Sequence, residues 1–174
     1  MPAVRRSAIT GAPGAGKSTL LAELAAQAVP VVPEVARSIL QSSGGMALRV
    51  SDPLGFADRM LDAQLAAWDC DGRGGSTVFD RGFADIVGFL WVEGLAVSDR
   101  LDRVCRKLVF DGPVFRARPW RAIYSPDDER IQDWNEAVAS DEAVTRAWKH
   151  FGYDLIDLPL ISARERAAFV LERL

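Results

Sequence analysis

The sequence predicts an α/β fold of three layers, in which a five-stranded parallel sheet carries helices on both faces. Apolar segments of strand length alternate along the chain with longer segments whose apolar residues recur every three or four positions. The 174 residues contain no internal repeat, low-complexity tract or long Pro/Gly/Ser linker. We therefore expect one domain over residues 1–174.

The first half of this alternation begins with a short apolar strand, residues 4–10, that ends at a glycine-rich loop. Residues 17–28 follow with helical spacing of leucines, and Pro30 ends that helix. The dipeptide Val31-Val32 starts a short second strand, and residues 34–41 continue as a helix. This order of strand, helix, strand and helix is typical of a parallel sheet.

A break at Ser43-Gly44-Gly45 separates this unit from the next helix. Asp52-Pro53 supplies an N-cap and a first-turn proline. The helix has an apolar face formed by Phe56, Met60, Leu61, Leu65 and Trp68. Residues 72–75 turn the chain into a third strand, residues 77–79, which ends at Asp80.

The second half repeats the pattern. Apolar residues between 86 and 91 predict a helix, and residues 99–108 predict another. A fourth strand includes Val114-Phe115. The segment of about residues 118–133 is polar, contains proline and resembles a lid loop. The alternative for this segment is an ordinary solvated loop.

Residues 132–150 are expected to be helical, with an interruption near Ser140-Asp141. A fifth strand follows at residues 153–158. Ser162 is positioned to cap the last helix, and Glu165 occupies the reciprocal capping-box position.

The loop after the first strand carries the most specific motif. Residues 11–18 read Gly-Ala-Pro-Gly-Ala-Gly-Lys-Ser, which fits the pattern G-x-x-x-x-G-K-[ST] between a strand and a helix. Its glycines let backbone N–H groups approach a β-phosphate, and the helix N-terminus adds a positive dipole end. The motif predicts a P-loop NTPase fold that binds ATP, with GTP possible. The expected nucleotide-binding residues are Gly11, Ala12, Pro13, Gly14, Ala15, Gly16, Lys17, Ser18 and Thr19.

The chemistry of this loop assigns two particular roles. Lys17 is expected to reach the β- and γ-phosphates, and the Ser18 hydroxyl to bind Mg²⁺. Asp80 ends the third strand about sixty residues later, where an aspartate can hold Mg²⁺ through water. Arg81 follows directly and is expected to hold the acceptor. The alternative is a surface turn in which Asp80 caps the next helix.

A second pair of charged residues, Glu34 and Arg37, follows the second strand. In an open parallel sheet both lie at the carboxyl edge beside the P-loop, where ligands bind. Glu34 can accept a hydroxyl proton as a general base, and Arg37 can form forked hydrogen bonds to a phosphate or carboxylate of the acceptor. The alternative is a surface ion pair between residues three apart on a helix.

Within the lid-like segment, Arg130 is expected to cover the transferring phosphoryl group and exclude water. Trp120 and Tyr124 are candidates for stacking on a substrate ring, or for anchoring the loop. The single histidine, His150, cannot contribute to a cluster of several histidines, and no Gly-x-Ser-x-Gly motif indicates a hydrolase.

The bulk composition excludes several classes of function. A net charge of −3 argues against broad binding to nucleic acids or anionic membranes. No apolar run approaches the length of a membrane span. Two cysteines without a metal or redox spacing, and a start that lacks the apolar core of a secretory signal, predict a cytoplasmic protein with unpaired thiols. The sequence carries no signal for an oligomeric state.

With these residues in place, the chain resembles the AAA-type predicted ATPases of the P-loop kinase lineage, related to the ribosylnicotinamide kinase domain. The resemblance spans about residues 4–173. It rests on residues 10–20, 34–37, 79–82 with Asp85, 119–120, 123–124, 128–130, 151–153 and 158–159.

The resemblance implies a five-stranded P-loop kinase core, Mg-nucleotide binding and phosphoryl transfer to a small molecule. Deoxynucleoside-kinase-like enzymes of this lineage use an acid after the second strand and an acid–arginine pair after the third. Glu34, Asp80 and Arg81 match these positions, and Asp85 joins the expected acceptor-binding residues. A second-region arginine finger and a C-terminal helical lid domain are not found, so a ring-forming machine is not expected.

Three functions remain open from the sequence. The first is a kinase in which Mg-ATP lies on the P-loop and an unidentified small molecule accepts the γ-phosphoryl group. The second is a nucleotide-dependent switch or ATPase that acts through a partner and needs no acceptor pocket. The third is a GTPase, against which the absence of an Asn-Lys-x-Asp motif counts.

Overall fold

The computed structural model describes residues 5–70, 75–124 and 133–174, and within them it contains a five-stranded sheet. The strands lie in the order β2-β3-β1-β4-β5, and every neighbouring pair is parallel, as the sequence predicts. They are β1 (Arg5–Gly11), β2 (Val31–Val32), β3 (Ser76–Asp80), β4 (Val114–Ala117) and β5 (Leu155–Asp157).

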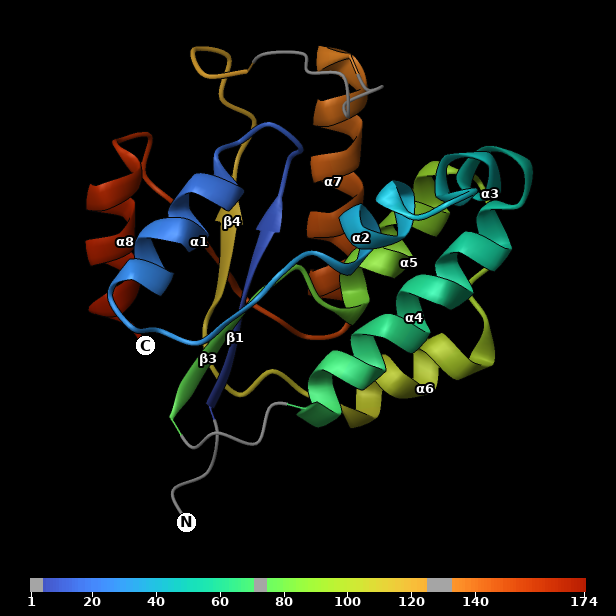
Figure 1. Ribbon diagram of the computed structural model, residues 1–174, viewed down its shortest axis with the longest axis horizontal. Helices are drawn as coiled ribbons and strands as arrows, with labels where there is room; N and C mark the ends of the chain where they lie inside the picture. Colours follow the sequence, from blue (N-terminus) through green and yellow to red (C-terminus); the bar gives the residue numbers. More distant parts are fainter. Residues whose placement is uncertain (1–4, 71–74, 125–132) are drawn as a thin grey trace.

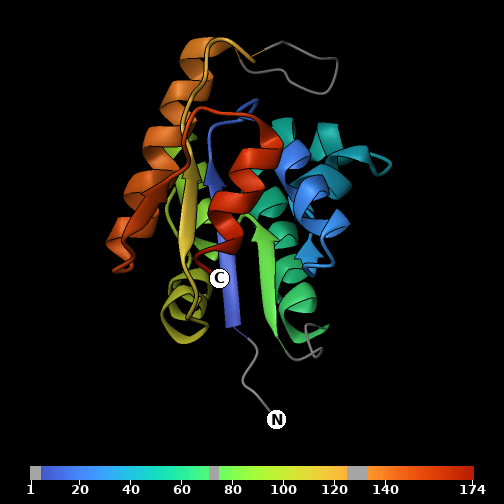
Figure 2. The same ribbon diagram turned by 90° about the vertical axis from the view of Figure 1, so that its left-hand side faces the viewer.

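Helices cover both faces of the sheet (Figures 1 and 2). Helices α1 (Lys17–Ala26) and α8 (Ala163–Leu171) lie together on one face. Helices α5 (Phe83–Val92) and α7 (Trp134–His150) cover the other face. The remaining helices belong to the side of α5 and α7 and are α2 (Val35–Gln41), α3 (Gly45–Ser51), α4 (Pro53–Cys70) and α6 (Asp99–Lys107). In the described part of the chain, no helix is long and apolar enough to cross a membrane.

Each face of the sheet has its own hydrophobic cluster, because neighbouring residues of a strand point to opposite faces. Ala8 of β1 packs with α4, α5 and α7, whereas Ile9 packs with α1 and α8. Phe79 and Val78 divide in the same way on β3. Strands buried on both faces read as continuous apolar runs, and this explains why the sequence shows no polar alternation in them.

The expected helix ends are largely confirmed. Asp52 caps α4, since its carboxylate accepts a hydrogen bond of 2.9 Å from the Gly55 N–H. The capping box of α8 is also present, with the Ser162 N–H donating to Glu165 at 3.1 Å and the Glu165 N–H donating to the Ser162 hydroxyl at 3.3 Å.

One helix, α3, is missing from the sequence prediction. The sequence predicts a break at Gly44 and Gly45, whereas in the structure these glycines form a tight turn between α2 and α3. Gly44 adopts a left-handed φ of 76°, and a Cβ at Gly45 would lie 1.8 Å from the Ile39 carbonyl oxygen. The glycines are therefore required by the close approach of two helices.

The interruption expected near Ser140-Asp141 is wrong, because α7 continues through both residues. Asp141 is 1% exposed, and its carboxylate pairs with the Arg116 guanidinium of β4. The Arg116 Nε donates to Asp141 at 3.2 Å. The pair joins α7 to the sheet. Asp141 is therefore polar because it forms a tertiary contact, and it does not mark the end of a helix.

We predict that Asp141→Asn destabilises the protein by about 1–3 kcal/mol, because the substitution removes the charge of the buried one of the two carboxylates that pair with the Arg116 guanidinium. Urea unfolding gives the free energy of unfolding directly. Asp102→Asn is the matched control, since Asp102 forms an i,i+4 ion pair with Arg106 on the exposed side of α6 and should hardly change the midpoint. Equal midpoints for the two variants would contradict the role of Asp141.

Candidate functional site

The loop between β1 and α1 is shaped by glycines. Gly11 has a φ of 119°, and a Cβ there would lie 2.2 Å from the Ala117 carbonyl oxygen of β4. Gly16 is the N-cap of α1 with a φ of 80°, and no side chain caps the helix. The first N–H groups of α1 are therefore open to an anion, in the arrangement that suits a phosphate.

Lys17 lies at the centre of this loop and is only 6% exposed. Its ammonium group donates to the Ala12 carbonyl oxygen at 2.6 Å. Burial lowers the pKa of Lys17 to about 8, and the nearby Arg81 cation acts in the same direction against the carboxylates of Asp80 and Glu34. The ammonium group is thus a desolvated cation, and a negatively charged ligand placed beside it would stabilise its charge.

Arg81 connects three segments that are distant in the sequence. Its Nε donates to the Glu34 carboxylate at 2.7 Å, and its Nη1 donates to Asp85 at 3.0 Å and to the Gly11 carbonyl oxygen at 3.2 Å. Its backbone has a φ of 72°, which is uncommon outside glycine. The side chain therefore fixes the end of β2, the start of the P-loop and α5 relative to one another.

Asp85 holds Arg81 in place. Its carboxylate also accepts hydrogen bonds from the Thr10 hydroxyl at 2.6 Å, the Gly82 N–H at 2.9 Å and the Trp148 indole N–H at 3.0 Å. Four donors thus converge on one carboxylate that is 6% exposed. A carboxylate saturated in this way has little capacity left for a ligand.

Asp80 differs from Asp85 because part of its carboxylate is unsatisfied. It ends β3 opposite Ile9 of β1, two residues before the P-loop. Its Oδ1 is buried without a hydrogen-bond partner in the described part of the chain. Burial, followed by the negative charge of Glu34, raises the pKa of Asp80 to about 6. An ionised oxygen without a donor fits a site for a cation, as expected for Mg²⁺.

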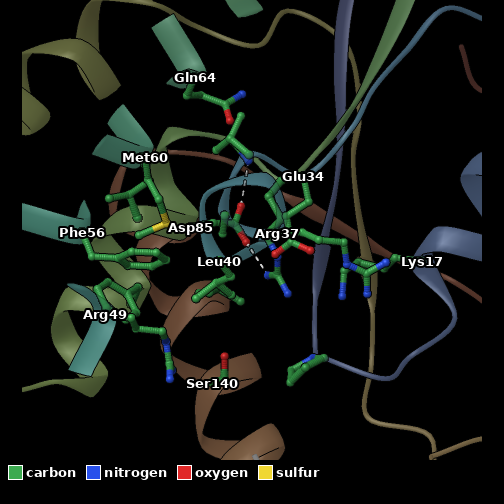
Figure 3. Close-up of a pocket in the computed structure, with 18 of the residues that line it drawn as sticks. Lys17, Glu34, Arg37, Leu40, Arg49, Phe56, Met60, Gln64, Asp85 and Ser140 are labelled. Atoms are coloured by element: carbon green, nitrogen blue, oxygen red, sulfur yellow. Dashed lines mark hydrogen bonds and ion pairs between the residues drawn. The ribbon is translucent and has the colours of Figure 1, made fainter. Parts of the chain in front are cut away.

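A cavity of about 390 Å³ extends from the P-loop to the helices beyond it (Figure 3). Its polar end is lined by Lys17, Ser18, Glu34, Arg37 and Arg81. The remainder is more apolar and is lined by side chains of α2, α3, α4 and α5, among them Leu40, Met46, Phe56, Met60, Ile86 and Phe89. One continuous space therefore joins a phosphate-binding loop to an apolar compartment.

The structure brings most of the predicted site residues to this cavity. Pro13, Gly14, Gly16, Thr19 and Asp85 also line it, whereas the methyl groups of Ala12 and Ala15 are buried. Asp80 lies beside it, at the end of β3.

The lid-like segment contributes less to the described site. Trp120 packs beneath the guanidinium of Arg166, 4.7 Å from its ring centre, and Tyr124 packs edge-on against Trp134. Neither ring is among the residues that line the cavity. Arg130 and the remainder of residues 125–132 lie outside the described residues.

Two site residues were missed by sequence reasoning, Arg166 and Gln64. Arg166 of α8 is 1% exposed, and its guanidinium donates to the Ala15 carbonyl oxygen of the P-loop at 2.8 Å and to the Pro159 carbonyl oxygen at 2.7 Å. Gln64 of α4 lines the cavity and is 2% exposed. Both are polar residues on the apolar face of a helix, and this pattern was the available signal.

The fold and the site together define a P-loop protein, with a glycine-rich loop between the first strand and helix of a five-stranded parallel sheet. A family model described as "AAA domain" matches residues 6–166, and the chain belongs to this family. The resemblance to an AAA-type family of the P-loop kinase lineage is thereby confirmed. A comparison with curated proteins finds no match.

Solved structures share the fold at low sequence identity. A deoxyadenosine kinase from M. mycoides, with dCMP and dCDP bound, matches with a TM-score of 0.72 at 14% identity over 96% of this chain and 97% of that chain. The NadR protein in complex with NR matches with a TM-score of 0.66 at 17% identity over 98% of this chain and 49% of that chain. Thymidylate kinase from Candida albicans matches with a TM-score of 0.64 at 12% identity, covering 97% and 90%.

The state of Asp80 leads to a prediction for the metal-free protein. Because folding raises its pKa from 3.8 to about 6, the folded protein holds this proton more tightly, and the associated stability is lost as the pH rises through about 6. Asp80→Asn should therefore raise the free energy of unfolding by about 1–3 kcal/mol at pH 7.5 and change it little near pH 4.

The measurement is urea unfolding in EDTA at both pH values. Asp58→Asn, on the exposed side of α4, is the matched control and should change neither value. A loss of stability in Asp80→Asn at pH 7.5 would show that the ionised carboxylate has a favourable partner in the protein.

Arg166 leads to a second prediction. Arg166→Met keeps much of the packing volume but leaves the carbonyl groups of Ala15 and Pro159 without their donor, which costs about 1–3 kcal/mol of stability. Because one of these carbonyls belongs to the P-loop, the affinity for Mg-ATP should also fall, as measured by calorimetry on the folded variant. Arg164→Met, exposed on the same helix, is the control. Unchanged affinity in folded Arg166→Met would limit Arg166 to a structural role.

Proposed function

We propose that the protein is a kinase that transfers the γ-phosphoryl group of Mg-ATP to a hydroxyl or phosphate of a small molecule. The observation that carries this proposal is the continuous cavity, which has a phosphate-binding loop at one end and an apolar compartment at the other. A nucleotide-dependent switch requires only the first of these. The acceptor compartment therefore favours the kinase.

In this proposal the P-loop, residues 11–19, holds the triphosphate through its backbone N–H groups, with GTP as a possible alternative to ATP. Lys17 exchanges its carbonyl partner for the β- and γ-phosphates. The Ser18 hydroxyl and the unsatisfied Asp80 carboxylate would hold Mg²⁺. When bound there, Mg²⁺ would supply positive charge beside the phosphate oxygens during transfer. Arg130 remains a predicted cover for the phosphoryl group.

Glu34 is the proposed general base. Burial alone would raise its pKa, but the charges of Arg81 and Lys17 outweigh burial, and the net direction is downward. The carboxylate is therefore ionised at neutral pH and able to accept a proton. Arg81 holds it toward the cavity at 2.7 Å, between the P-loop and the apolar compartment.

The remaining polar residues have two proposed roles: some contact the acceptor, and others position the residues that contact it. Arg37 lies at the exposed edge of the cavity, where its guanidinium can bind a polar group of the acceptor. Arg81 contributes to the same contact. Asp85 was expected to bind the acceptor directly, but its saturated carboxylate supports a role in positioning Arg81 instead. Trp120 and Tyr124 do not line the cavity, and their packing against Arg166 and Trp134 supports the alternative role of anchoring the lid-like segment.

The comparisons support phosphoryl transfer at the level of the fold. The matched structures include a deoxyadenosine kinase and a thymidylate kinase, whose substrates are a nucleoside and a nucleotide by name. At sequence identities of 14% and 12%, these matches support a common fold. The acceptor of this protein is to be identified by experiment.

The kinase proposal predicts different effects of Glu34→Gln on catalysis and on binding. An acceptor is first identified by screening nucleosides, nucleotides and vitamins for ATP-dependent phosphorylation. With it, Glu34→Gln should lower kcat by roughly 10²–10⁴, because the amide cannot accept the proton. The affinity for Mg-ATP, measured by calorimetry, should change little, since the P-loop is intact.

Glu142→Gln, an exposed substitution on α7, controls for the loss of a carboxylate. A wild-type rate in Glu34→Gln would remove Glu34 from the role of base. If no acceptor is phosphorylated, and both the wild type and Glu34→Gln slowly hydrolyse ATP, the switch would replace the kinase.

A further inference from the structure

A buried cation, Arg166 of α8, lies behind the P-loop. Helix α8 packs beside α1, on the face of the sheet away from α5 and α7 (Figure 1). The Arg166 guanidinium donates to the Ala15 carbonyl oxygen at 2.8 Å and to the Pro159 carbonyl oxygen at 2.7 Å. Its Nη2 is buried and has no hydrogen-bond partner among the described residues. Arg166 does not line the cavity, so a ligand there would not touch it.

The charge of Arg166 has no acidic counterpart in the described part of the chain. Its hydrogen bonds there go to carbonyl oxygens, and no described carboxylate forms an ion pair with it. Burial and the positive charge of Arg118 both lower the pKa of Arg166, as expected for such a cation. Buried charges in proteins are usually paired, because removing an isolated charge from water is unfavourable. The fold therefore holds an unbalanced positive charge next to the P-loop.

The peptide bond between Ala15 and Gly16 connects this charge with the phosphate-binding side of the loop. The described peptide bonds are trans, so the Gly16 N–H points away from the Ala15 carbonyl and hence away from Arg166. In a P-loop such N–H groups face the phosphates. A cation at the carbonyl polarises the peptide and makes its N–H a stronger donor. Two hydrogen bonds and one peptide would place Arg166 roughly 8 Å from a bound phosphate oxygen.

Trp120 holds the guanidinium in this position from outside the cavity. Its ring centre lies 4.7 Å from the guanidinium carbon, so the ring covers one face of the ion. Ile123 follows three residues later and also approaches the loop, because a Cβ at Gly16 would lie 3.1 Å from the Ile123 Cδ1 and 3.4 Å from the Arg166 Nη1. An aromatic face keeps water away from the ion, and a poorly hydrated charge acts over a longer distance.

We propose that Arg166 is a positioning residue of the phosphate site, whose buried charge acts on bound phosphates through the Ala15–Gly16 peptide and is held in place by Trp120. This inference rests on the polyphosphate binding of the proposed kinase function. Arg166 strengthens the P-loop without contacting the ligand, and its charge contributes more than its hydrogen bonds. Trp120 then contributes to phosphate binding although its ring does not line the cavity.

Inorganic tripolyphosphate with Mg²⁺ tests the role of the charge, because this probe reaches the P-loop without a base or a sugar. Calorimetry compares wild type with Arg166→Lys, which keeps the charge, and with Arg166→Gln, which keeps an N–H donor and is neutral. We expect Arg166→Gln to bind about 10–100-fold more weakly and Arg166→Lys to stay within about threefold of wild type, because a poorly hydrated charge attracts an anion over several ångströms. Equal losses in the two variants would overturn the role of the charge.

A double-mutant cycle tests the role of Trp120. Trp120→Leu should weaken tripolyphosphate binding by about 3–10-fold in the wild-type background and have no effect in Arg166→Gln. Trp134→Leu is the matched control, because Trp134 covers the exposed Arg121 guanidinium in the same way, at 4.8 Å, and should leave the affinity unchanged. An equal effect of Trp120→Leu in both backgrounds, or an equal effect of Trp134→Leu, would overturn the coupling of Trp120 to Arg166.

Near-UV circular dichroism establishes which variants are folded. If no Arg166 variant folds, Trp120→Leu decides alone, and a wild-type affinity in it would overturn the proposal. The failure of this inference is distinguishable from that of the kinase proposal. A wild-type affinity in folded Arg166→Gln would overturn the role of Arg166 and leave the kinase in place. A wild-type protein that binds neither tripolyphosphate nor Mg-ATP would overturn both.

Discussion

The site depends on the guanidinium of Arg81. It joins Glu34 after β2, the Gly11 carbonyl oxygen at the start of the P-loop and Asp85 on α5. Glu34 is 47 residues and Gly11 is 70 residues from Arg81 in the sequence, whereas Asp85 is 4 residues away. The planar guanidinium of Arg81 holds all three together. The backbone of Arg81 is left-handed, a conformation that costs of order 1–3 kcal/mol and persists only where the surroundings enforce it.

The charges around Arg81 are unevenly compensated, and this supports the proposed binding of a nucleotide and a metal. Two cations, Lys17 and Arg81, face the carboxylates of Glu34, Asp80 and Asp85. Arg81 donates hydrogen bonds to Glu34 and Asp85. The Oδ1 of Asp80 has no hydrogen-bond partner among the described residues, and burial raises the pKa of Asp80 to about 6. A divalent cation at Asp80 and a polyphosphate at Lys17 would each relieve a desolvated charge. Because these two ligands carry opposite charges, each would also favour binding of the other in the proposed function.

Much of this arrangement follows from sequence patterns. The P-loop motif, the apolar strands and the rule that parallel strands end at one edge were sufficient to predict the sheet and to place Glu34 and Asp80 beside Lys17. These features are local, or they depend only on strand direction. The P-loop motif and the periodicity of apolar residues therefore predict these features without any knowledge of side-chain partners.

The features that were missed depend on partners that are distant in the sequence. Asp141 lies within an unbroken helix because Arg116, twenty-five residues earlier, neutralises it. Arg166 is buried because carbonyl groups of the P-loop and of the loop before α8 accept its hydrogen bonds. Gln64 lines the cavity, and its Nε2 has no hydrogen-bond partner among the residues that the structure describes. In each case a polar residue on an apolar helix face was the signal, and for Asp141 and Arg166 the tertiary contact determined the role.

The transfer of a labelled γ-phosphoryl group tests the central claim most directly. ATP carrying ¹⁸O in its γ-phosphoryl group is incubated with the protein, Mg²⁺ and a mixture of small-molecule hydroxyl compounds, and the products are separated by mass spectrometry. The account predicts that the label appears on a member of the mixture in wild type and is lost from it in Lys17→Ala. Label found only in inorganic phosphate, at a rate independent of the mixture, would contradict it.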